Sequence, residues 1–449
     1  MGGKTEHAER TSRLSFGGAF ALENWGSPAM TLQTSASPPA TLADLIQRLD
    51  HARSTGEREM GPEAGTVPVS HYTDRHHWQQ EQDIVFAQWP IVAAHSSEVP
   101  AGSALPFDAL GVPMVVTRSG DGRVRAFFNV CRHRGMALVQ SEGPEPATAR
   151  SCKTLVCPYH GWTYELDGRL RHRLHAETFD GIDPATLNLV ELPCAEAGGL
   201  IFVKRTPGPA FSAAGFLHGL DEHLQWLGLA DMKVFRKIDR VYAANWKLTV
   251  DAFLEGYHIR VLHRDTIYPF FADAFTVNLD AGPHQNSLVA RRRAFEAFET
   301  PRDRDALCKL ATPTQFLFPN TFLIWHPDYV SLIGMFSPAA GEVRWMHTML
   351  IPPDRIGDDW IPHWEKTFRL IEETVFQKED IATAVAIQRG LHSGANAGLQ
   401  AGRLEHGMLR FHRGIDAAIG GALVPEGCQV EMSSGVGGGG AYLARSGIG

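Results

Sequence analysis

Two short stretches of the sequence place cysteine beside histidine. Cys131 and His133 stand in CRHRG, and Cys157 and His160 stand in CPYHGW. Thiolates and imidazoles are metal ligands, and two of each can close a tetrahedron around Zn²⁺ or hold an iron–sulfur cluster in which two histidines replace two cysteines. Because four such ligands recur within one short region, the sequence predicts a single metal centre built by two loops.

The spacing of these ligands favours one of the two possible centres. Structural zinc sites usually take both cysteines from one segment and both histidines from another. Here each segment supplies a mixed pair, which suits a two-iron cluster because each loop then reaches across both irons. Gly135 and Pro158 suit tight loops around such a cluster. On ligand count alone, zinc stays open as the alternative.

A second pair of imidazoles lies in NWKLTVDAFLEGYHIRVLH, residues 245–263. His258 and His263 are five positions apart, which on a regular helix turns them about 140° away from each other. They can share a metal only if the helix is distorted or ends between them, and such distortions are frequent at functional sites. The pair by itself is a weak indication of a metal site.

Both regions resemble the ring-hydroxylating oxygenase α subunits, which are Rieske non-heme iron oxygenases. CRHRG and CPYHGWTYELDGRL resemble the Rieske signature of that family, and NWK and YH resemble its catalytic signature. The resemblance implies that Cys131 and Cys157 hold one iron of a [2Fe–2S] cluster and that His133 and His160 hold the other. It spans roughly residues 80 to 410.

The segment between the two ligand pairs is longer than is usual in the family. The extra residues, SEGPEPATARSCK, predict a polar insertion on the surface. Cys152 lies in this insertion, and we interpret it as a residue that does not bind the cluster.

The resemblance also implies a mononuclear Fe(II) held by two histidines and one carboxylate, with other positions open for O2. His258 and His263 are the expected imidazoles. VFQKEDIATAVAIQRGL, residues 375–391, resembles the segment that supplies the carboxylate, and it points to Asp380. The rival is Glu379, which we expect on a solvated helix face.

Helical spacing supports the choice of Asp380. On an α-helix this carboxylate shares a face with Phe376, Ala384 and Ile387. A carboxylate on an apolar face is costly unless it is paired or bound to a metal. The pattern therefore favours Asp380 over its neighbour.

Glu255 lies three residues before His258, which would place it one helical turn behind that ligand. In the family that the sequence resembles, an Asp or Glu at this position lies between the mononuclear iron and the Rieske cluster of the neighbouring subunit. Ring-dihydroxylating members typically have Asp there, so Glu255 is a departure. Asp251, a further turn back, is the next candidate for this bridging role.

Composition limits the class of protein. The chain has 449 residues, of which 44% are hydrophobic and 20% charged, which is enough for a sizeable core and more than one domain. A net charge of −8 does not indicate a nucleic-acid or membrane partner. Six scattered or metal-spaced cysteines fit a reducing compartment, and no apolar run is long enough to cross a bilayer. We expect a cytoplasmic protein.

The pattern of expected strands and helices, taken together with the resemblance, predicts an α+β fold. It comprises an N-terminal all-β Rieske domain and a C-terminal helix-grip (START-like) catalytic domain with an antiparallel sheet. Residues 114–130 predict a hairpin around Gly-Asp-Gly, 200–205 a strand, 315–325 and 345–353 strands, and 360–390 a long helix. The expected segments are a disordered extension (1–40), a helical segment of the catalytic part (41–85) with a helix after a Thr cap at 41–53, the Rieske domain (86–205), the catalytic iron domain (206–432) and a flexible Gly-rich tail (433–449).

These features predict the terminal oxygenase of a multicomponent system. It would use O2 and electrons from NAD(P)H, delivered by a reductase with or without a ferredoxin, to hydroxylate a small aromatic compound in aromatic hydrocarbon catabolism. The alternatives are an oxidative N- or O-demethylase acting on a quaternary ammonium or methoxy compound, and a Rieske electron carrier without oxygenase activity. The resemblance implies a homotrimer, with the presence of a β subunit left open.

Aromatic residues near the catalytic motifs are candidates for the substrate pocket. Aromatic walls suit an aromatic ring, and they also suit a quaternary ammonium group through cation–π contacts. The candidates are Phe253, Phe316, Phe318, Phe322, Trp325 and His326.

Overall fold

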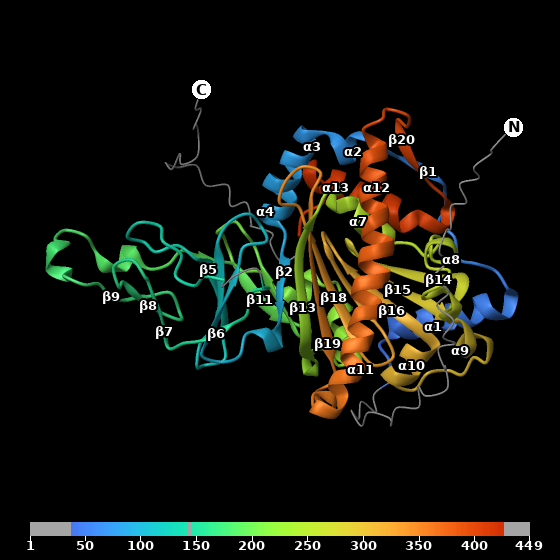
Figure 1. Ribbon diagram of the computed structural model, residues 1–449, viewed down its shortest axis with the longest axis horizontal. Helices are drawn as coiled ribbons and strands as arrows, with labels where there is room; N and C mark the ends of the chain where they lie inside the picture. The colour runs from blue at the N-terminus through green and yellow to red at the C-terminus, as the bar shows by residue number, and fades with distance from the viewer. Residues whose placement is uncertain (1–36, 142–144, 426–449) are drawn as a thin grey trace, which may run out of the picture. The chain divides into compact units, whose positions relative to one another are not determined.

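A computed structural model describes residues 37–141 and 145–425 (Figure 1). Most of the expected N-terminal extension, the Gly-rich tail 433–449 and Cys428 lie outside the described residues. Several small antiparallel sheets precede one large antiparallel sheet with helices packed on it, which confirms the predicted α+β fold. Within 37–141 and 145–425, no helix is both long and apolar enough to span a bilayer.

Three small sheets make up the Rieske part. The predicted hairpin at 114–130 is confirmed as β4 and β5, which pair around a turn in which Gly122 has a φ of 80°. The five-stranded sheet has the order β10 (Glu191–Leu192), β5 (Val124–Phe128), β4 (Met114–Arg118), β3 (Ser103–Phe107), β6 (Arg150–Ser151). The three-stranded sheets are β11 (Cys194–Ala197), β12 (Leu200–Val203), β2 (Ile91–His95), and β7 (Thr154–Val156), β8 (Thr163–Glu165), β9 (Leu170–His172).

One seven-stranded antiparallel sheet forms the centre of the catalytic part. Its order is β13 (Lys233–Tyr242), β19 (Val343–Ile351), β18 (Val330–Phe336), β17 (Thr321–Trp325), β16 (Ala311–Leu317), β15 (His284–Arg291), β14 (Phe271–Ala281). The run 315–325, expected as one strand, is instead a hairpin that turns at Phe318–Asn320 between β16 and β17. The Pro-Asn pair supplies this turn chemistry.

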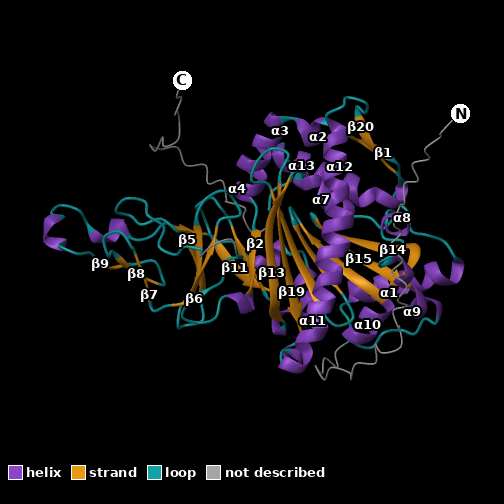
Figure 2. Ribbon diagram, in the orientation of Figure 1, coloured by secondary structure: helices purple, strands orange, loops and turns teal. Residues whose placement is uncertain are grey.

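Helices pack on the large sheet (Figure 2). The predicted helix at 360–390 is continuous, but its middle is a π-helix rather than an α-helix. The principal helices are α1 (Ala40–Thr55), α7 (Trp246–Phe253), α8 (Ile259–Leu262), α11 (Ile361–Phe368), the π-helix η9 (Arg369–Ile381), α12 (Ala382–Leu391) and α13 (His406–Ile419). The shorter ones are α2 (Ser70–Thr73), α3 (Arg75–Gln80), the π-helix η1 (Glu81–Val85), α4 (Phe86–Gln88), α5 (Ala213–Phe216), α6 (Leu220–Leu227), α9 (Arg292–Glu296) and α10 (Arg304–Leu310).

Helix α1 begins one residue earlier than expected and has a different cap. Its N-cap is Pro39, which makes no side-chain hydrogen bond to the helix. Thr41, expected as the cap, lies inside the first turn, and its hydroxyl lies 2.6 Å from His223 Nε2. The Thr41 hydroxyl therefore contacts His223, which is distant in the sequence, instead of capping the helix.

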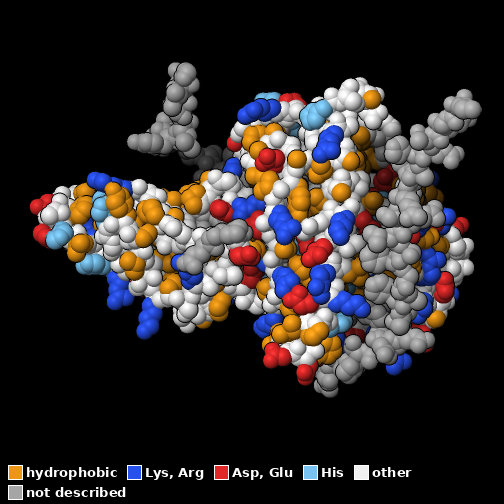
Figure 3. Space-filling model, viewed as in Figure 1, with side chains coloured by type: hydrophobic (Ala, Val, Ile, Leu, Met, Phe, Trp, Pro, Cys, Tyr) orange, Lys and Arg blue, Asp and Glu red, His pale blue; other side chains and the backbone are white. Residues whose placement is uncertain are grey.

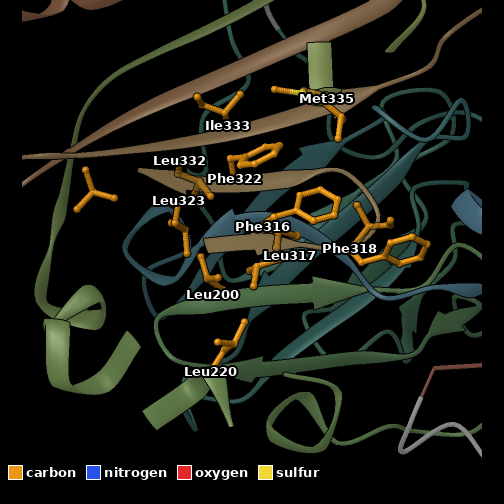
Figure 4. Close-up of a cluster of buried hydrophobic side chains, with 14 of the residues drawn as sticks. Leu200, Leu220, Phe316, Leu317, Phe318, Phe322, Leu323, Leu332, Ile333 and Met335 are labelled. Atoms are coloured by element: carbon orange, nitrogen blue, oxygen red, sulfur yellow. The ribbon is translucent and has the colours of Figure 1, made fainter. Parts of the chain in front are cut away.

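One large apolar core runs from the Rieske part into the catalytic part, and a second buried cluster surrounds Cys131 and Cys157. Figure 4 shows Leu200 of β12 and Leu220 of α6 beside side chains of β16, β17 and β18. The Trp89 ring packs edge-on against Phe318, with 4.6 Å between the ring centroids. Because these side chains are buried together, the two parts share one hydrophobic core.

Helix α7 is anchored by a buried ion pair. Lys247 Nζ bonds Glu81 of η1, and both side chains are fully buried. The Trp246 indole donates to the other oxygen of Glu81 at 2.8 Å, so both carboxylate oxygens are engaged. These contacts fix the helix that leads directly into the segment carrying His258.

Candidate functional site: two metal centres

Two loops of the same design carry the Cys/His motifs. The Cys131 amide donates to Met136 O, and the carbonyl of Cys131 accepts from Gly135 N at 2.9 Å. The second loop repeats this pattern. The Cys157 amide donates to Trp162 O, and the carbonyl of Cys157 accepts from Gly161 N at 3.0 Å.

Both loops close on a glycine in the left-handed region. Gly135 has a φ of 79° and Gly161 a φ of 68°, a conformation in which other residues are strained. Each loop thus folds back on itself and presents its cysteine and histidine together.

The four motif side chains gather as two like pairs. Cys131 and Cys157 are buried free thiols that belong to the same buried cluster. The rings of His133 and His160 lie 4.6 Å apart. Nδ1 of each histidine is buried and has no hydrogen-bond partner. Burial and the neighbouring His160 lower the pKa of His133, which favours the neutral imidazole that a metal requires.

This arrangement fits a two-iron cluster better than one zinc ion. Among the described residues, no group of side chains whose donor atoms lie close enough together to bind a single metal ion includes these four residues. A pair of thiolates on one side and a pair of imidazoles on the other match the two different irons of a Rieske [2Fe–2S] cluster. The unpartnered Nδ1 atoms are the ones that would bind iron.

Tyr164, which the sequence analysis did not single out, contacts the thiol pair. Its hydroxyl lies 3.5 Å from Cys131 Sγ and accepts the Arg132 amide at 3.0 Å. Burial raises the pKa of Tyr164 above its usual value, so the hydroxyl keeps its proton and can donate to sulfur. Cys152 shows no such contact; its amide donates to Gly102 O on the edge of the five-stranded sheet.

The second constellation places three side chains around one point. His258 precedes α8 and His263 follows it, so both stand at the ends of a one-turn helix and escape the regular spacing that would separate them. Asp380 Oδ1 lies 3.1 Å from His263 Nε2 and 3.7 Å from His258 Nε2. The ligand atoms of all three lie within 4.8 Å of one another.

The environment of Asp380 suits a bound cation. Its side chain is only 5% exposed, and Oδ1 has no hydrogen-bond partner. A buried carboxylate left in this state is costly unless it is bound to a metal or paired with a charge. Two imidazoles and a carboxylate on one side of a metal are the donors that non-heme Fe(II) uses.

Asp380 lies in the π-helix η9, and this alters the predicted helix face. Phe376 and Ala384 are buried as expected, but Ile387 is exposed. A π-helix has more residues per turn than an α-helix, so the α-helical spacing used for the prediction fails across its end. The π-helical turns are therefore in the same segment of helix that carries the Asp380 carboxylate.

A glutamate holds each histidine of the second constellation from behind. Nδ1 of His258 hydrogen-bonds to Glu255, which also accepts the amides of Tyr257 and His258. Nδ1 of His263 donates to Glu379 Oε2 at 2.7 Å. Since Nδ1 of both rings is hydrogen-bonded, Nε2 is free to bind a metal. A histidine that binds a metal commonly donates its other ring N–H to a carboxylate in this way.

The expectation for Glu379 is therefore wrong. Its side chain is only 18% exposed and also accepts the Thr266 hydroxyl at 2.9 Å. The sequence offered no signal for this, because His263 lies far from Glu379 along the chain. Asp251, the reserve candidate for the bridging role, instead accepts Tyr72 OH at 2.7 Å and lies 3.1 Å from His412 Nε2.

The candidate pocket residues divide into two groups. Phe253 and Phe322 belong to an aromatic cluster with Trp345 and Phe376, in which Phe253 lies 5.6 to 5.8 Å from the other three rings. Phe376 is one helical turn before Asp380. This group borders the second constellation, and Phe316 packs against it at 4.8 Å from Phe322.

Two further candidates, Phe318 and Trp325, are core residues, as are Phe316 and Phe322. Phe318 packs on Trp89, and the indole of Trp325 donates to Gln315 Oε1 at 2.7 Å. The strand pleat turns Trp325 to the face opposite Phe322, because odd and even positions alternate. His326 lies beyond the end of β17 and stacks on Tyr329 with 4.1 Å between the rings.

Comparisons with known families match both parts of the chain. The family described as "Rieske [2Fe-2S] domain" matches residues 88–183, and the family described as "Ring hydroxylating alpha subunit (catalytic domain)" matches residues 229–421.

Curated relatives extend this similarity over most of the chain. The carnitine monooxygenase oxygenase subunit of Acinetobacter baumannii is 32% identical over 366 residues, which is 78% of this chain and 93% of the relative. The glycine betaine monooxygenase oxygenase subunit of Pseudomonas aeruginosa (strain UCBPP-PA14) is 33% identical over 263 residues, 58% of this chain and 56% of the relative.

Solved structures share the fold. A quaternary ammonium Rieske monooxygenase in complex with L-carnitine has a TM-score of 0.66 and 22% identity, covering 85% of this chain and 99% of that one. Naphthalene 1,2-dioxygenase from Rhodococcus sp. bound to indole has the same TM-score with 19% identity, covering 85% and 98%. The fold alone therefore does not separate the two kinds of substrate.

The Tyr164 contact predicts a change in redox potential. Hydrogen bonds to cluster sulfurs raise the reduction potential, because they stabilise the more negative reduced state. Tyr164→Phe removes one such bond and is expected to lower the midpoint potential by about 20 to 65 mV, the one-electron equivalent of a hydrogen bond worth about 0.5–1.5 kcal/mol. Electrochemical titration followed by EPR measures this shift. An unchanged potential with an intact spectrum would show that the hydroxyl does not act on the cluster.

The triad geometry predicts different losses of iron for neighbouring carboxylates. Asp380→Ala removes a ligand and is expected to lower metal content from about three to about two irons per chain, with the Rieske spectrum unchanged. Glu379→Gln removes only the support of His263 and is expected to weaken Fe(II) affinity by about 10- to 100-fold. Iron analysis during graded chelation compares the two variants. If Glu379→Gln instead empties the site at saturating Fe(II), the two roles are exchanged.

Proposed function

The chain belongs to the Rieske non-heme iron oxygenases as an oxygenase (α) subunit, and from this premise we propose that it monooxygenates a quaternary ammonium compound. The observation that carries the proposal is the 32% identity to a carnitine monooxygenase oxygenase subunit, since it covers 93% of that relative. Similarity to a glycine betaine monooxygenase oxygenase subunit points to the same class of substrate. Oxygenase subunits of this family carry a Rieske cluster and a mononuclear iron and work with a reductase.

This proposal replaces the expectation of an aromatic substrate. Ring hydroxylation was the main prediction from the sequence, with demethylation of a quaternary ammonium compound as the alternative. The named relatives favour the alternative. Glu255 in place of the Asp typical of ring-dihydroxylating members agrees with it. An electron carrier without oxygenase activity is not supported, because the catalytic-domain family matches residues 229–421.

The reaction follows from the chemistry of the substrate class. One atom of O2 enters a C–H bond next to the quaternary nitrogen, and the other leaves as water after two electrons and two protons have been added. The carbon–nitrogen bond of the hydroxylated carbon then breaks with its electron pair going to nitrogen, which releases a tertiary amine, an aldehyde and the hydroxyl proton. The [2Fe–2S] cluster would supply single electrons and the mononuclear iron would activate O2.

We assign the ligand roles within this proposal. Cys131, Cys157, His133 and His160 would hold the cluster, and His258, His263 and Asp380 the mononuclear iron. The protein's own contribution is to fix the imidazoles through Glu255 and Glu379 and to keep the neighbourhood apolar.

The aromatic cluster supports a cationic substrate. Ring faces attract a trimethylammonium group, with about 0.5 to 2 kcal/mol per contact depending on burial. Phe376 lies four residues before Asp380 on the same helix, and Phe253 ends α7 five residues before His258. Their rings can hold the onium group beside the iron without forming a covalent bond.

We further propose that electrons cross between subunits of a homotrimer. Among the described residues, the recorded contacts of His258 and His263 come from the catalytic part, and none comes from the Rieske ligand loops. Tyr257 and Val261, beside these histidines, are 62% and 80% exposed, and Tyr159, beside His160, is 57% exposed. Apolar surface on both motifs suits docking of one copy's Rieske loops on the next copy's α8.

A basic surface near the Rieske loops suits an acidic electron donor. Arg132 and Arg134 flank His133 and are exposed, and Arg169 and Arg171 of the β9 region are also exposed. Figure 3 shows basic and histidine side chains around this end of the protein, with acidic side chains at its far tip. We propose that the reductase or a ferredoxin docks there through negative charges.

Turnover of a matched panel tests the proposed substrate class. Purified protein, a surrogate reductase and NADH are supplied with glycine betaine, carnitine, choline or naphthalene, and products are scored by mass spectrometry and aldehyde release. We expect oxidation of at least one trimethylammonium compound and none of naphthalene. Hydroxylated naphthalene with no oxidised ammonium compound would restore ring hydroxylation as the function.

Glu255→Gln tests the bridging role. The substitution keeps the shape of the side chain but removes its charge. Both metal centres are expected to stay filled, and dithionite is expected to reduce the cluster, while product per turnover falls steeply because electrons no longer reach the iron efficiently. Single turnover with a pre-reduced cluster follows cluster oxidation and product together. If Glu255→Gln oxidises its cluster and forms product at the rates of the parent protein, Glu255 only supports His258 and does not bridge the two centres.

A further inference from the structure

A third group of metal-binding side chains shares no residue with the two metal centres. It consists of His71 in α2, His77 in α3 and Asp416 in α13. One donor atom of each residue lies within 4.8 Å of the other two, the same spacing that groups the three residues of the second constellation. Figure 1 shows α2, α3 and α13 close together at the top of the view.

A break between two short helices brings the histidines together. They stand six residues apart, and α2 ends at Thr73 between them. Asp74 then begins α3 by accepting the His76 amide at 2.8 Å. The imidazole rings of His71 and His77 stack with their centroids 4.7 Å apart and their planes 16° apart. One ion can therefore contact a nitrogen of each ring.

Hydrogen bonds to α13 and α7 orient the His71 ring. Its Nδ1 lies 3.3 Å from Nδ1 of His412, whose Nε2 lies 3.1 Å from Asp251 Oδ1. Asp251 also accepts the Tyr72 hydroxyl at 2.7 Å, and an ionised carboxylate can only accept. With one proton on each ring, His412 therefore carries its proton on Nε2 and accepts the Nδ1–H of His71 at its own Nδ1. The lone pair of His71 is then on Nε2.

The unprotonated nitrogen of His71 faces a carboxylate. Nε2 lies 3.6 Å from Asp416 Oδ1, which is beyond hydrogen-bond distance. Burial lowers the pKa of His71 despite the opposing charge of Asp416, and the neighbouring His412 and His77 lower it further. The neutral imidazole is the form that a metal requires. Two electron pairs thus point into one space, where a cation can bind both.

His77 supplies the third donor. In the described part of the chain, its buried Nε2 has no hydrogen-bond partner. Glu81 Oε1 lies 3.2 Å away, but Lys247 Nζ already bonds that oxygen. A buried polar nitrogen without a partner costs stability, which a bound ion would recover. The two histidine side chains are each 14% exposed and Asp416 is 51% exposed, so an ion can enter from solvent beside the carboxylate.

We propose that His71, His77 and Asp416 form a third metal site, which binds a divalent transition-metal ion and above all Zn²⁺. Two imidazole nitrogens and one carboxylate oxygen suit Zn²⁺ and leave the fourth position of its tetrahedron for water. Donors of this kind bind Zn²⁺ more tightly than Fe²⁺. The ion joins the α2–α3 segment to α13, and His412 and Asp251 connect it to α7, the helix that leads to the second constellation. This site does not depend on the proposed substrate class.

Zinc binding to the iron-loaded holoprotein tests the site. Tag-free protein is titrated with ZnCl2, desalted, and analysed for zinc and iron together, and competition with a chromophoric chelator gives the affinity. We expect about one Zn²⁺ per chain on the ligand count, with no loss of iron. Zinc K-edge absorption is expected to show nitrogen and oxygen ligands at about 2.0–2.1 Å and no sulfur at about 2.3 Å, which excludes zinc in the Rieske loops.

Matched variants assign the donors. Asp416→Asn keeps the shape of an exposed side chain, and His77→Gln removes an imidazole. Each is expected to weaken zinc binding by more than about 100-fold, beyond the loss of about 10- to 100-fold for an outer partner of a ligand. His76→Gln removes the neighbouring exposed histidine and is expected to leave the affinity unchanged. Zn²⁺ is expected to raise the Tm of the parent and of His76→Gln but not of Asp416→Asn.

Several results would overturn the proposal. The parent protein could bind no Zn²⁺, exchange it one for one with iron, or show sulfur ligands. Asp416→Asn could bind Zn²⁺ as tightly as the parent, and because this residue is exposed, that comparison holds even if His77→Gln does not fold. An equal loss in His76→Gln would make the binding a general property of surface histidines. None of these results bears on the proposed substrate class, which the substrate panel tests separately.

Discussion

The catalytic part of the protein depends on one costly contact, a buried carboxylate facing two imidazoles. Asp380 Oδ1 lies within 4 Å of both His258 and His263 and finds no hydrogen bond. In an apolar setting such a group destabilises the fold by several kcal/mol unless a cation neutralises it. The anchors around it, Glu255 and Glu379 on the two Nδ1 atoms, keep the three donors facing one another.

The Rieske loops solve a related problem by different means. Their donors are held by backbone bonds and left-handed glycines at Gly135 and Gly161, whereas the mononuclear site uses side-chain carboxylates. The Tyr164 hydroxyl lies beside Cys131 Sγ, whereas Nδ1 of each loop histidine has no hydrogen-bond partner. The hydroxyl contact at the thiols affects the reduction potential of the cluster. The carboxylates behind the histidines of the mononuclear site affect its affinity for metal.

Local chemistry made part of this structure predictable from sequence. The ligand pairs and the 114–130 hairpin follow from residue types at short spacing, which do not need the rest of the fold. The π-helix η9 could not be predicted, because its apolar spacing differs little from that of an α-helix. Glu379 and Tyr164 gain their roles from residues distant in the chain. Trp325, a pocket candidate beside Phe322, lies on the opposite face of β17 because the two positions differ by an odd number of residues.

The pairing of β1 (Gly65–Pro68) with β20 (Gly398–Ala401) has a consequence for the order in which a nascent chain matures. These strands are about 330 residues apart, so this ladder cannot form until most of the chain has left the ribosome. The thiol and imidazole pairs of the Rieske loops are complete by residue 160, whereas Asp380 emerges much later. Cluster assembly can therefore begin on a partly synthesised chain, but Fe(II) capture has to wait for nearly the whole polypeptide.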